Sequence, residues 1–427
     1  MKLSRPMAAS LALLLSACTC PCMQHHAPET KSHRPPHLFR YEYSSLERLR
    51  TLYNNHDPAA MPIVDALLAN ADKALNDKPY SVVYKKHTLP GVTDPHEYVS
   101  LAPYYWPNPD TPNHLPYIAK DGQRNPEFKD YDADNLMMLT DHVDAFVLAW
   151  FITGDQKYAD RTALLIKTWF LNPETRMNPN LDHCQSQPGI NDAFHSGIIE
   201  SRRFIDMIDA TCLLRGNSAW TQADNEAFKQ WIGEYNHWMK TAKVPLEEDA
   251  APNNHGTWYD VQIASYDVYT GNFESAKKIL ETAKEKRIGS QIKADGTQPE
   301  ELKRTKAFWY SEFNLNALAQ LCNIGRHPAV QVDLWNYESP KGGSMKKAID
   351  WLIPYAAGEK EWTYQQIEGL SAKEFLVPVR QAELVWNTTQ YEPQLAKLRG
   401  QDVKTDDDTE HPLRPKGLQN LLYPPPQ

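Results

Sequence analysis

The sequence predicts an all-α fold, an (α/α) toroid or solenoid built from antiparallel helix pairs. Two observations predict it. Long stretches carry apolar residues at helical spacing, as at Leu136, Leu139, Val143 and Phe146. The strand and helix patterns do not alternate as they would in a parallel α/β sheet. No self-similar period of about 33 to 45 residues is visible either, which disfavours tetratricopeptide and ankyrin arrays.

About eleven stretches are expected to be helices, paired through connecting loops. Gly154, Gly216 and Gly271 follow three of the expected helix ends, where a left-handed residue terminates a helix at little cost. The tail carries three consecutive aspartates and three consecutive prolines, which are typical of a frayed surface segment. The expected helices cover residues 43–53, 59–75, 135–153, 157–170, 197–214, 222–241, 255–269, 273–288, 299–322, 345–357 and 372–389.

The amino terminus has the pattern of an export signal. Lys2 and Arg5 precede an apolar run that ends at Leu15 and is too short to span a bilayer. Small residues then lead into Cys18, which resembles a bacterial lipoprotein signal; an ordinary cleaved secretory signal is the alternative. We therefore expect an exported protein of a Gram-negative bacterium, periplasmic or anchored to the outer membrane by a lipid on Cys18.

These features divide the 427 residues into four parts. We expect a signal peptide at 1–17, a flexible His- and Pro-rich tether at 18–40, a toroid domain at 41–400 and a C-terminal tail at 401–427.

Composition excludes several functions. The formal charge is −9, and no cluster of Lys and Arg is interleaved with aromatic residues, so no nucleic-acid partner is expected. Cys184, Cys212 and Cys322 have no metal-ligand spacing, and His183 with Cys184 or His195 lacks a third ligand, so we expect neither a metal nor a cofactor. The 12 Trp and 21 Tyr suit either a carbohydrate-binding surface or an aromatic-rich core. No obligate protein partner is evident.

Four irregular segments hold most of the unusual polar and aromatic residues. They cover residues 98–122, 183–200, 251–260 and 293–310. In a helical barrel such loops gather at one rim, so we expect one cleft there. A structural role is the alternative for each member: caps, packed aromatics or buried polar pairs. The candidate substrate-binding residues are Lys303, Tyr104, Tyr105, Trp106, Gln187, Asn191, His195, Glu200, Trp258 and Trp309.

The candidate catalytic residues are Asn254, His255, Arg304 and Tyr310. Together they suit removal of the proton alpha to a uronic carboxylate, because amide, imidazole and cation donors can neutralise the charge that develops on it. A phenol near cations can act as base and then protonate the leaving oxygen. Lys303 lies seven residues before Tyr310, on the same face of a continuous helix, whereas Arg304 lies six before it, so which cation assists stays open.

These residues resemble a known family. The segments Asn253-Asn254-His255-x-x-Trp258 and Asp295-Gly-x-x-Pro-Glu300, the basic helix that ends in Tyr310, and the aromatic loop at 98–109 are similar to the alginate lyase superfamily over residues 80 to 330. The resemblance is closer to polysaccharide lyase family 38, which acts on mannuronate-type alginate or glucuronan, than to family 5. It implies an incomplete toroid and metal-independent β-elimination with Tyr310 as acid and base.

We therefore predict a lyase that cuts 1,4-linked uronate polymers. In mannuronate and glucuronate the C5 proton and O4 lie on one side of the ring, which suits a single tyrosine, whereas guluronate would require His255 as base. Two alternatives stay open. One is a non-catalytic glycan-binding lipoprotein of an uptake system; the other is a helical-barrel glycoside hydrolase that would use two carboxylates, Asp192 and Glu300.

Overall fold

A computed structural model of the protein describes residues 35–372, 374–398 and 413–426. All of the described helices and strands belong to one unit, residues 36–427. The predicted signal peptide at 1–17 and the predicted tether up to residue 34 lie outside the described residues, as does Cys18.

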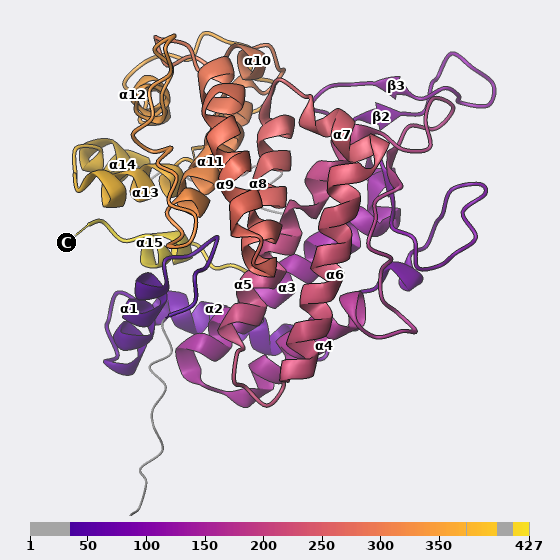
Figure 1. Ribbon diagram of the computed structural model, residues 1–427, viewed down its shortest axis with the longest axis horizontal. Helices are drawn as coiled ribbons and strands as arrows, with labels where there is room; N and C mark the ends of the chain where they lie inside the picture. The colour runs from indigo at the N-terminus through magenta and orange to yellow at the C-terminus, as the bar shows by residue number, and fades with distance from the viewer. Residues whose placement is uncertain (1–34, 373, 399–412, 427) are drawn as a thin grey trace, which may run out of the picture. The chain divides into compact units, whose positions relative to one another are not determined.

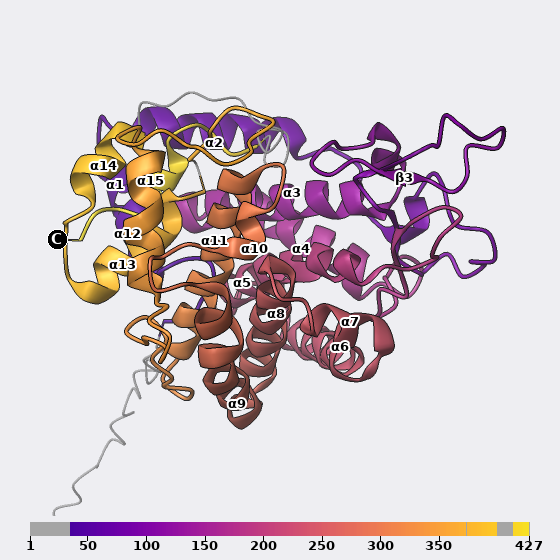
Figure 2. The same ribbon diagram turned by 90° about the horizontal axis from the view of Figure 1, so that it is seen from above.

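Five helices follow one another along the inside of the fold (Figures 1 and 2). They are buried on nearly every side: α8, for example, buries all its residues from Gly256 to Val268. A helix that is apolar all round is stable only when neighbours cover it completely. Each of these helices packs against the next in the series. The inner helices are α3 (Asp132–Thr153), α5 (Phe204–Leu213), α8 (Asn254–Thr270), α11 (Ala307–Gly325) and α13 (Leu376–Trp386).

Four amphipathic helices cover the inner series from outside. In α9 only Ala276, Leu280 and Ala283 are buried, three positions on one face of the helix. The inner and outer helices alternate along the chain, which is the arrangement of an α/α toroid. The predicted all-α fold class is therefore confirmed. The outer helices are α4 (Gln156–Phe170), α6 (Gln222–Thr241), α9 (Phe273–Ala283) and α12 (Met345–Ala356).

Helix α3 is long and apolar enough to cross a membrane by length and composition, the one helix among the described residues that is. Its most apolar window is 83% buried inside the protein. Gly154 ends it at φ 72°, and Gly271 ends α8 at φ 91°, as the sequence predicts. These properties are those of a core helix.

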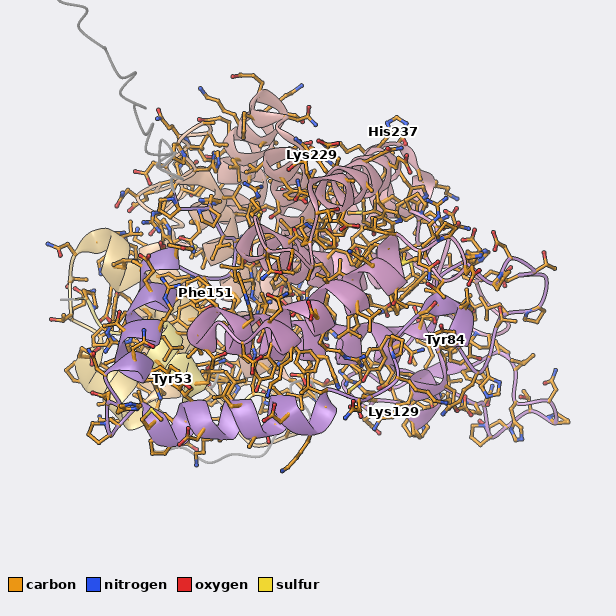
Figure 3. The ribbon with its side chains drawn as sticks, turned by 90° about the horizontal axis from the view of Figure 1, so that it is seen from below. Tyr53, Tyr84, Lys129, Phe151, Lys229 and His237 are labelled. Atoms are coloured by element: carbon orange, nitrogen blue, oxygen red, sulfur yellow. The ribbon has the colours of Figure 1, made fainter. Side chains whose placement is uncertain are left out.

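The two ends of the described chain meet on the α3 and α5 side. Helix α1 (Tyr43–Asn54) packs on α3, where Tyr43 contacts the ring of Phe151 edge-on. Figure 3 views this side of the molecule and labels Tyr53 of α1 and Phe151 of α3. Helix α15 (Leu418–Leu422), which lies within the predicted tail, packs against α1 and buries Leu418 and Leu422. The final described stretch is therefore part of the core, unlike the frayed end that its prolines suggest. Helices α2 (Met61–Ala74) and α14 (Glu392–Leu398) complete the set at these ends.

Buried ion pairs join these ends to the inner helices. Nε of Arg414 lies 2.7 Å from Asp144 of α3, and its Nη2 donates to the hydroxyl of Tyr41 over 2.8 Å. The Tyr423 hydroxyl donates to the carbonyl of Arg40 over 2.6 Å. Asp144 is 4% exposed, so its charge depends on Arg414 for compensation.

Three predicted helices prove to be interrupted. The stretch 197–214 begins as the 3₁₀ segment η3 (His195–Arg203) before α5, and 273–288 ends in the π-helical turn η4 (Lys284–Gly289). The stretch 299–322 consists of the short helix α10 (Pro299–Leu302), a break at 303–306, and α11. A periodicity of apolar residues continues across such breaks, so it cannot reveal them.

The loops carry short strands that the helical pattern does not predict. Strand β1 (Val99–Leu101) pairs in parallel with β4 (His183–Ser186), and β2 (Tyr105–Trp106) pairs antiparallel with β3 (Ile118–Ala119). The helical turns η1 (Val82–Tyr84), η2 (Pro126–Asp130) and α7 (Lys243–Asp249) were likewise not expected. The first pair fixes the aromatic loop beside the segment that leads into η3.

Candidate active site

The four predicted loop segments line one cavity of about 630 Å³. Its walls come from the β2 region, from η3, from the α7–α8 junction and from the break between α10 and α11. A volume in this range is typical of a ligand-binding pocket. The cavity is therefore the candidate active site.

The α7–α8 junction is held by a buried arginine of the π-helical turn. Arg287 donates to the carbonyl oxygens of Asp249 and Ala251 and pairs with Asp260 through Nε at 2.8 Å. A Cβ on Gly256 would lie 2.2 Å from the Ala251 oxygen and 2.3 Å from Arg287, so only glycine fits there. This clamp fixes the start of α8 at the cavity wall.

Asn253 is the N-cap of α8, and its side chain accepts a hydrogen bond from the backbone N–H of His255. Asn254 is consequently free of the capping role. Its backbone N–H and its Nδ2 donate to the two oxygens of Glu301 over 2.6 and 2.8 Å. Burial raises the pKa of Glu301 to about 7, against the lowering effect of these hydrogen bonds.

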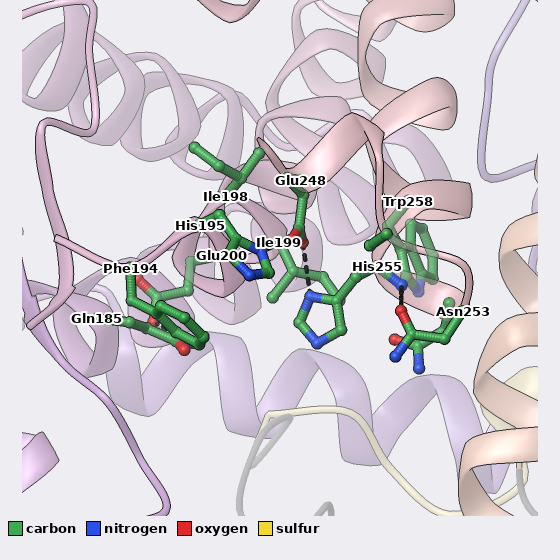
Figure 4. A network of polar contacts seen from close by, with 12 residues as sticks. Gln185, Phe194, His195, Ile198, Ile199, Glu200, Glu248, Asn253, His255 and Trp258 are labelled. Atoms are coloured by element: carbon green, nitrogen blue, oxygen red, sulfur yellow. Dashed lines mark hydrogen bonds and ion pairs between the residues drawn. The ribbon is translucent and has the colours of Figure 1, made fainter. Parts of the chain in front are cut away.

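One buried carboxylate joins two histidines of the cavity (Figure 4). Glu248 of α7 accepts from Nδ1 of His255 at 2.5 Å and from Nδ1 of His195 at 2.7 Å, each at a different oxygen. A carboxylate at Nδ1 fixes the proton there and leaves Nε2 as the nitrogen that can face a ligand. The hydrogen bond to Glu248 raises the pKa of His195, against the effect of burial.

The pKa of Glu248 itself lies below its usual range. Burial alone would raise it, but the charge of His255 and the hydrogen bonds from both imidazoles outweigh burial. Glu248 is therefore an anion at neutral pH, held between two imidazoles.

Arg304 and Tyr310 form a second unit in the lining of the same cavity. Nη2 of Arg304 donates to the Tyr310 hydroxyl over 2.6 Å and to Asp121 over 2.6 Å, and its Cζ lies 3.6 Å from the centroid of the Tyr310 ring. The Tyr310 hydroxyl also donates to that of Tyr104 over 3.2 Å. Asp121 holds the break in place as well, because it accepts from the backbone N–H and the hydroxyl of Thr305.

Burial raises the pKa of Tyr310 well above its usual value, and the neighbouring Tyr104 adds to this, whereas the Arg304 guanidinium opposes it. Without a ligand the phenol therefore carries its proton at neutral pH. Arg304 is the nearby charge that makes the phenolate accessible.

Comparison with known proteins supports a family assignment. A family model described as alginate lyase matches residues 81–362. The chain belongs to the alginate lyase family. No curated protein matches the chain. Among solved structures, an alginate lyase from Bacteroides ovatus is 36% identical over 90% of this chain and 98% of its own, with a TM-score of 0.82.

More distant members of the alginate lyase fold are similar as well. A histidine-to-alanine variant of alginate lyase A1-III complexed with tetrasaccharide is 13% identical over 90% of this chain and 94% of its own, with a TM-score of 0.55. A tyrosine-to-phenylalanine variant, also complexed with tetrasaccharide, is 14% identical over 90% of this chain and 95% of its own, with a TM-score of 0.51. At this identity the likeness shows the fold alone.

The cavity of this alginate lyase family member contains all four predicted catalytic residues. Arg304 rather than Lys303 contacts Tyr310. The helical-wheel argument for Lys303 is wrong because the helix breaks at 303–306, and the side chain of Lys303 instead pairs with Glu300 over 2.6 Å and is 66% exposed. The predicted substrate-binding residues that also line the cavity are Tyr104, Tyr105, His195, Glu200 and Trp309.

Four other predicted contact residues lie outside the cavity lining. Trp106 donates to the carbonyl of Gln123, and Gln187 and Asn191 bond to each other across a tight turn. Trp258 is 5% exposed and packs on Phe313 in the core (Figure 4 shows its place beside His255). For Trp106, Gln187 and Asn191 the contacts support the structural alternatives, whereas Trp258 lines a second, smaller cavity.

Glu200 lines the cavity, but its oxygens are occupied by hydrogen bonds. It accepts from Tyr98 over 2.9 Å, from Ser100 over 2.7 Å and from Gln185 over 3.1 Å. It therefore joins β1 and β4 to η3, and His195, five residues before it, pairs with Glu248 instead.

Sequence reasoning missed three carboxylates that orient the site: Glu248, Glu301 and Asp121. Each lies beside a quoted motif, but its partner is distant in sequence, so spacing gives no signal. The two carboxylates of the hydrolase alternative, Asp192 and Glu300, do not line the cavity. Within the described part of the chain, no group of three or more His, Cys, Asp or Glu side chains could hold a metal ion.

Proposed function

We propose that this polysaccharide lyase cleaves 1,4-linked uronate polymers, mannuronate-type alginate or glucuronan, by β-elimination. The observation that carries the proposal is the contact between the Arg304 guanidinium and the Tyr310 hydroxyl in the wall of a cavity that Asn254 and His255 also line. The Bacteroides ovatus neighbour is named an alginate lyase, which supports the substrate class.

The proposed reaction starts at C5 of the uronate. The C5–H bond breaks, its electron pair forms the C4–C5 double bond, and the C4–O4 bond breaks. Tyr310 takes the C5 proton as the phenolate and returns a proton to O4, which leaves as a hydroxyl. The products are a shortened chain and an unsaturated uronate at the new non-reducing end. In this scheme the chemistry requires no metal.

Charge on the carboxylate controls the acidity of C5. Asn254 uses one N–H on Glu301, which leaves its second Nδ2 proton for the uronate carboxylate. The Arg304 guanidinium supplies further donors from the lining of the same cavity. If guluronate is the unit cleaved, base and acid must stand on opposite faces, and His255 with its fixed Nε2 lone pair takes the base role while Tyr310 protonates O4.

The experiment offers mannuronan, guluronan, glucuronan and pectate in turn and follows the ultraviolet absorbance of the unsaturated uronate. Absorbance that rises with mannuronan or glucuronan and disappears in Tyr310→Phe supports the proposal. New reducing ends without absorbance would indicate a hydrolase, and tight binding without products would indicate a glycan-binding protein; either result contradicts the lyase mechanism.

The amino-terminal pattern supports a proposal about location, namely that the chain is exported and tethered through a lipid on Cys18. Expression with labelled palmitate in a Gram-negative host tests it. We expect the wild-type chain to carry the label. The Cys18→Ala variant should carry none and should be released from the membrane fraction.

A further inference from the structure

A second, smaller cavity adjoins the candidate active site. It measures about 100 Å³ and shares Arg202, Arg203, Trp309 and Phe313 with the larger cavity. Its other walls come from α11, from α13 and from the two chain ends at Arg40 and Tyr423. The four shared side chains thus lie between the catalytic groups and a space that the proposed reaction does not use.

One face of helix α11 lines both cavities with a row of side chains, Trp309, Phe313, Asn316 and Gln320, called the stripe below. Trp309 and Phe313 stack at 4.7 Å with an interplanar angle of 14°, and Asn316 and Gln320 follow on the same helical face. From Trp309 to Gln320 the stripe is roughly 16 Å long at the rise of an α-helix. The stripe begins next to Tyr310 and runs away from it, with aromatic rings first and amides beyond.

Two amides of the small cavity lack a hydrogen-bond partner within the described residues. Gln381 of α13 is 6% exposed, and its side chain makes no hydrogen bond; Gln320 of α11 is half-buried and also makes none. No polar atom of either amide is both buried and unpaired. Both amides are therefore open to the cavity, where a ligand can supply hydroxyl or carboxylate partners.

Arginines outnumber acidic side chains in the lining. Arg40, Arg202, Arg203 and Arg414 line it together with Asp206 and Glu374, and Arg414 pairs with Asp144 over 2.7 Å. Arg40 pairs with Asp206 over 2.9 Å. The guanidinium of Arg202 lies 5.3 Å from the centroid of the Phe313 ring and 5.8 Å from that of the Trp258 ring. It therefore lies over two aromatic rings of the small cavity. Such aromatic rings can stack against a sugar ring, and the guanidinium beside them can bind the carboxylate that this sugar carries.

We propose that the small cavity is a further subsite, which binds a uronate unit of the same chain beyond the units at the cleaved bond. This inference rests on the proposed function for its ligand class. Trp309 and Phe313 stack against the sugar ring between the cleaved bond and the small cavity, and Arg202 binds a carboxylate. The amides of Gln381 and Gln320 bind hydroxyls of the unit inside the small cavity. The subsite makes cleavage depend on chain length.

The test compares oligouronates from dimer to octamer in the wild type, in Gln381→Leu and in Gln320→Leu. Gln230→Leu is the matched control, because Gln230 lies on the outer helix α6 and bonds only to Glu234. The readout is the ratio of kcat/KM for the longest and the shortest cleaved oligomer. Each variant at the small cavity should lower this ratio about tenfold, and the control should leave it unchanged.

Binding separates this inference from the reaction itself. Calorimetry in the Tyr310→Phe background measures affinity against chain length, so the subsite can be tested even if no polymer is cleaved. The subsite is overturned if both variants show the same kcat/KM ratio and the same dependence of affinity on chain length as the control. An equal loss of affinity at every chain length also overturns it, because such a loss indicates damage to the fold. If Gln381→Leu does not fold, Gln320→Leu, at a half-buried position, decides alone.

Discussion

The Tyr310 hydroxyl and the Arg304 guanidinium contact each other twice, through a 2.6 Å hydrogen bond and through the placement of Cζ 3.6 Å from the ring centroid. Arg304 can reach the phenol because it lies in the break between α10 and α11 and not on a continuous helix. Asp121 holds the guanidinium from the other side. Burial raises the pKa of Tyr310, and this contact opposes that rise at the group on which the proposed reaction depends.

The first prediction concerns the phenol. Tyr310→Phe should lower kcat by at least about a thousandfold, because general acid–base catalysis typically contributes a factor of this order. The hydroxyl bonds only to Arg304 and Tyr104 among the described residues, so the thermal transition should change little. Tyr104→Phe is the control. It keeps the Arg304 contact, and its loss of activity should be much smaller.

The second prediction concerns the cation. Since the Arg304 charge opposes the raised pKa of Tyr310, Arg304→Ala should raise that pKa further. If the phenolate is the base, kcat/KM rises with pH through the Tyr310 pKa, and the rising limb of the profile should move to higher pH in the variant. A profile that falls in height at every pH without moving would assign Arg304 to substrate binding alone.

The third prediction concerns Glu248 and the pH dependence of stability. Its folded pKa lies below the ordinary 4.5, so its contribution is present above pH 4.5 and is lost as pH falls through the folded value. The folded pKa of His195 lies above the ordinary 6.5, so its contribution is complete below pH 6.5 and is lost as pH rises through the folded value.

The free energy of unfolding of the wild type should therefore exceed that of Glu248→Gln most at about pH 5 to 6, and less at about pH 9. Denaturant titrations at several pH values measure this difference. A difference that stays constant with pH would mean that the glutamine replaces the carboxylate at both imidazoles without electrostatic cost.

The fourth prediction concerns the buried pair that joins the chain ends to α3. Arg414→Met leaves Asp144 charged and buried, and should reduce the free energy of unfolding by about 3 to 5 kcal/mol. The double variant Arg414→Met with Asp144→Asn should recover part of this loss, because the unpaired charge is removed. Equal stability of the single and double variants would show that Asp144 is solvated or protonated without its partner.

The sequence allowed the helices and the meeting of four loops to be predicted because both follow from local patterns. Periodicity at Leu136 to Phe146 marks a helix, and left-handed glycines such as Gly154 and Gly271 mark its end. Asn254, His255, Arg304 and Tyr310 stood out because polar and aromatic groups at helix starts are rarely needed for packing alone.

What could not be predicted depends on contacts between distant residues. Glu248 is defined by His195, 53 residues before it, and Asp121 by Arg304, 183 residues after it. The strands β1 and β4 are three and four residues long and pair across the chain, so no alternation of useful length exists. The break at 303–306 depends on Asp121 binding Thr305, which no local pattern expresses.

The contact of Tyr423 with Arg40, together with that of Arg414 with Asp144, has a consequence for biosynthesis. Asp144 and Arg40 are translated early, whereas their partners Arg414 and Tyr423 follow 270 and 383 residues later. The nascent chain must therefore leave the ribosome with this seam open.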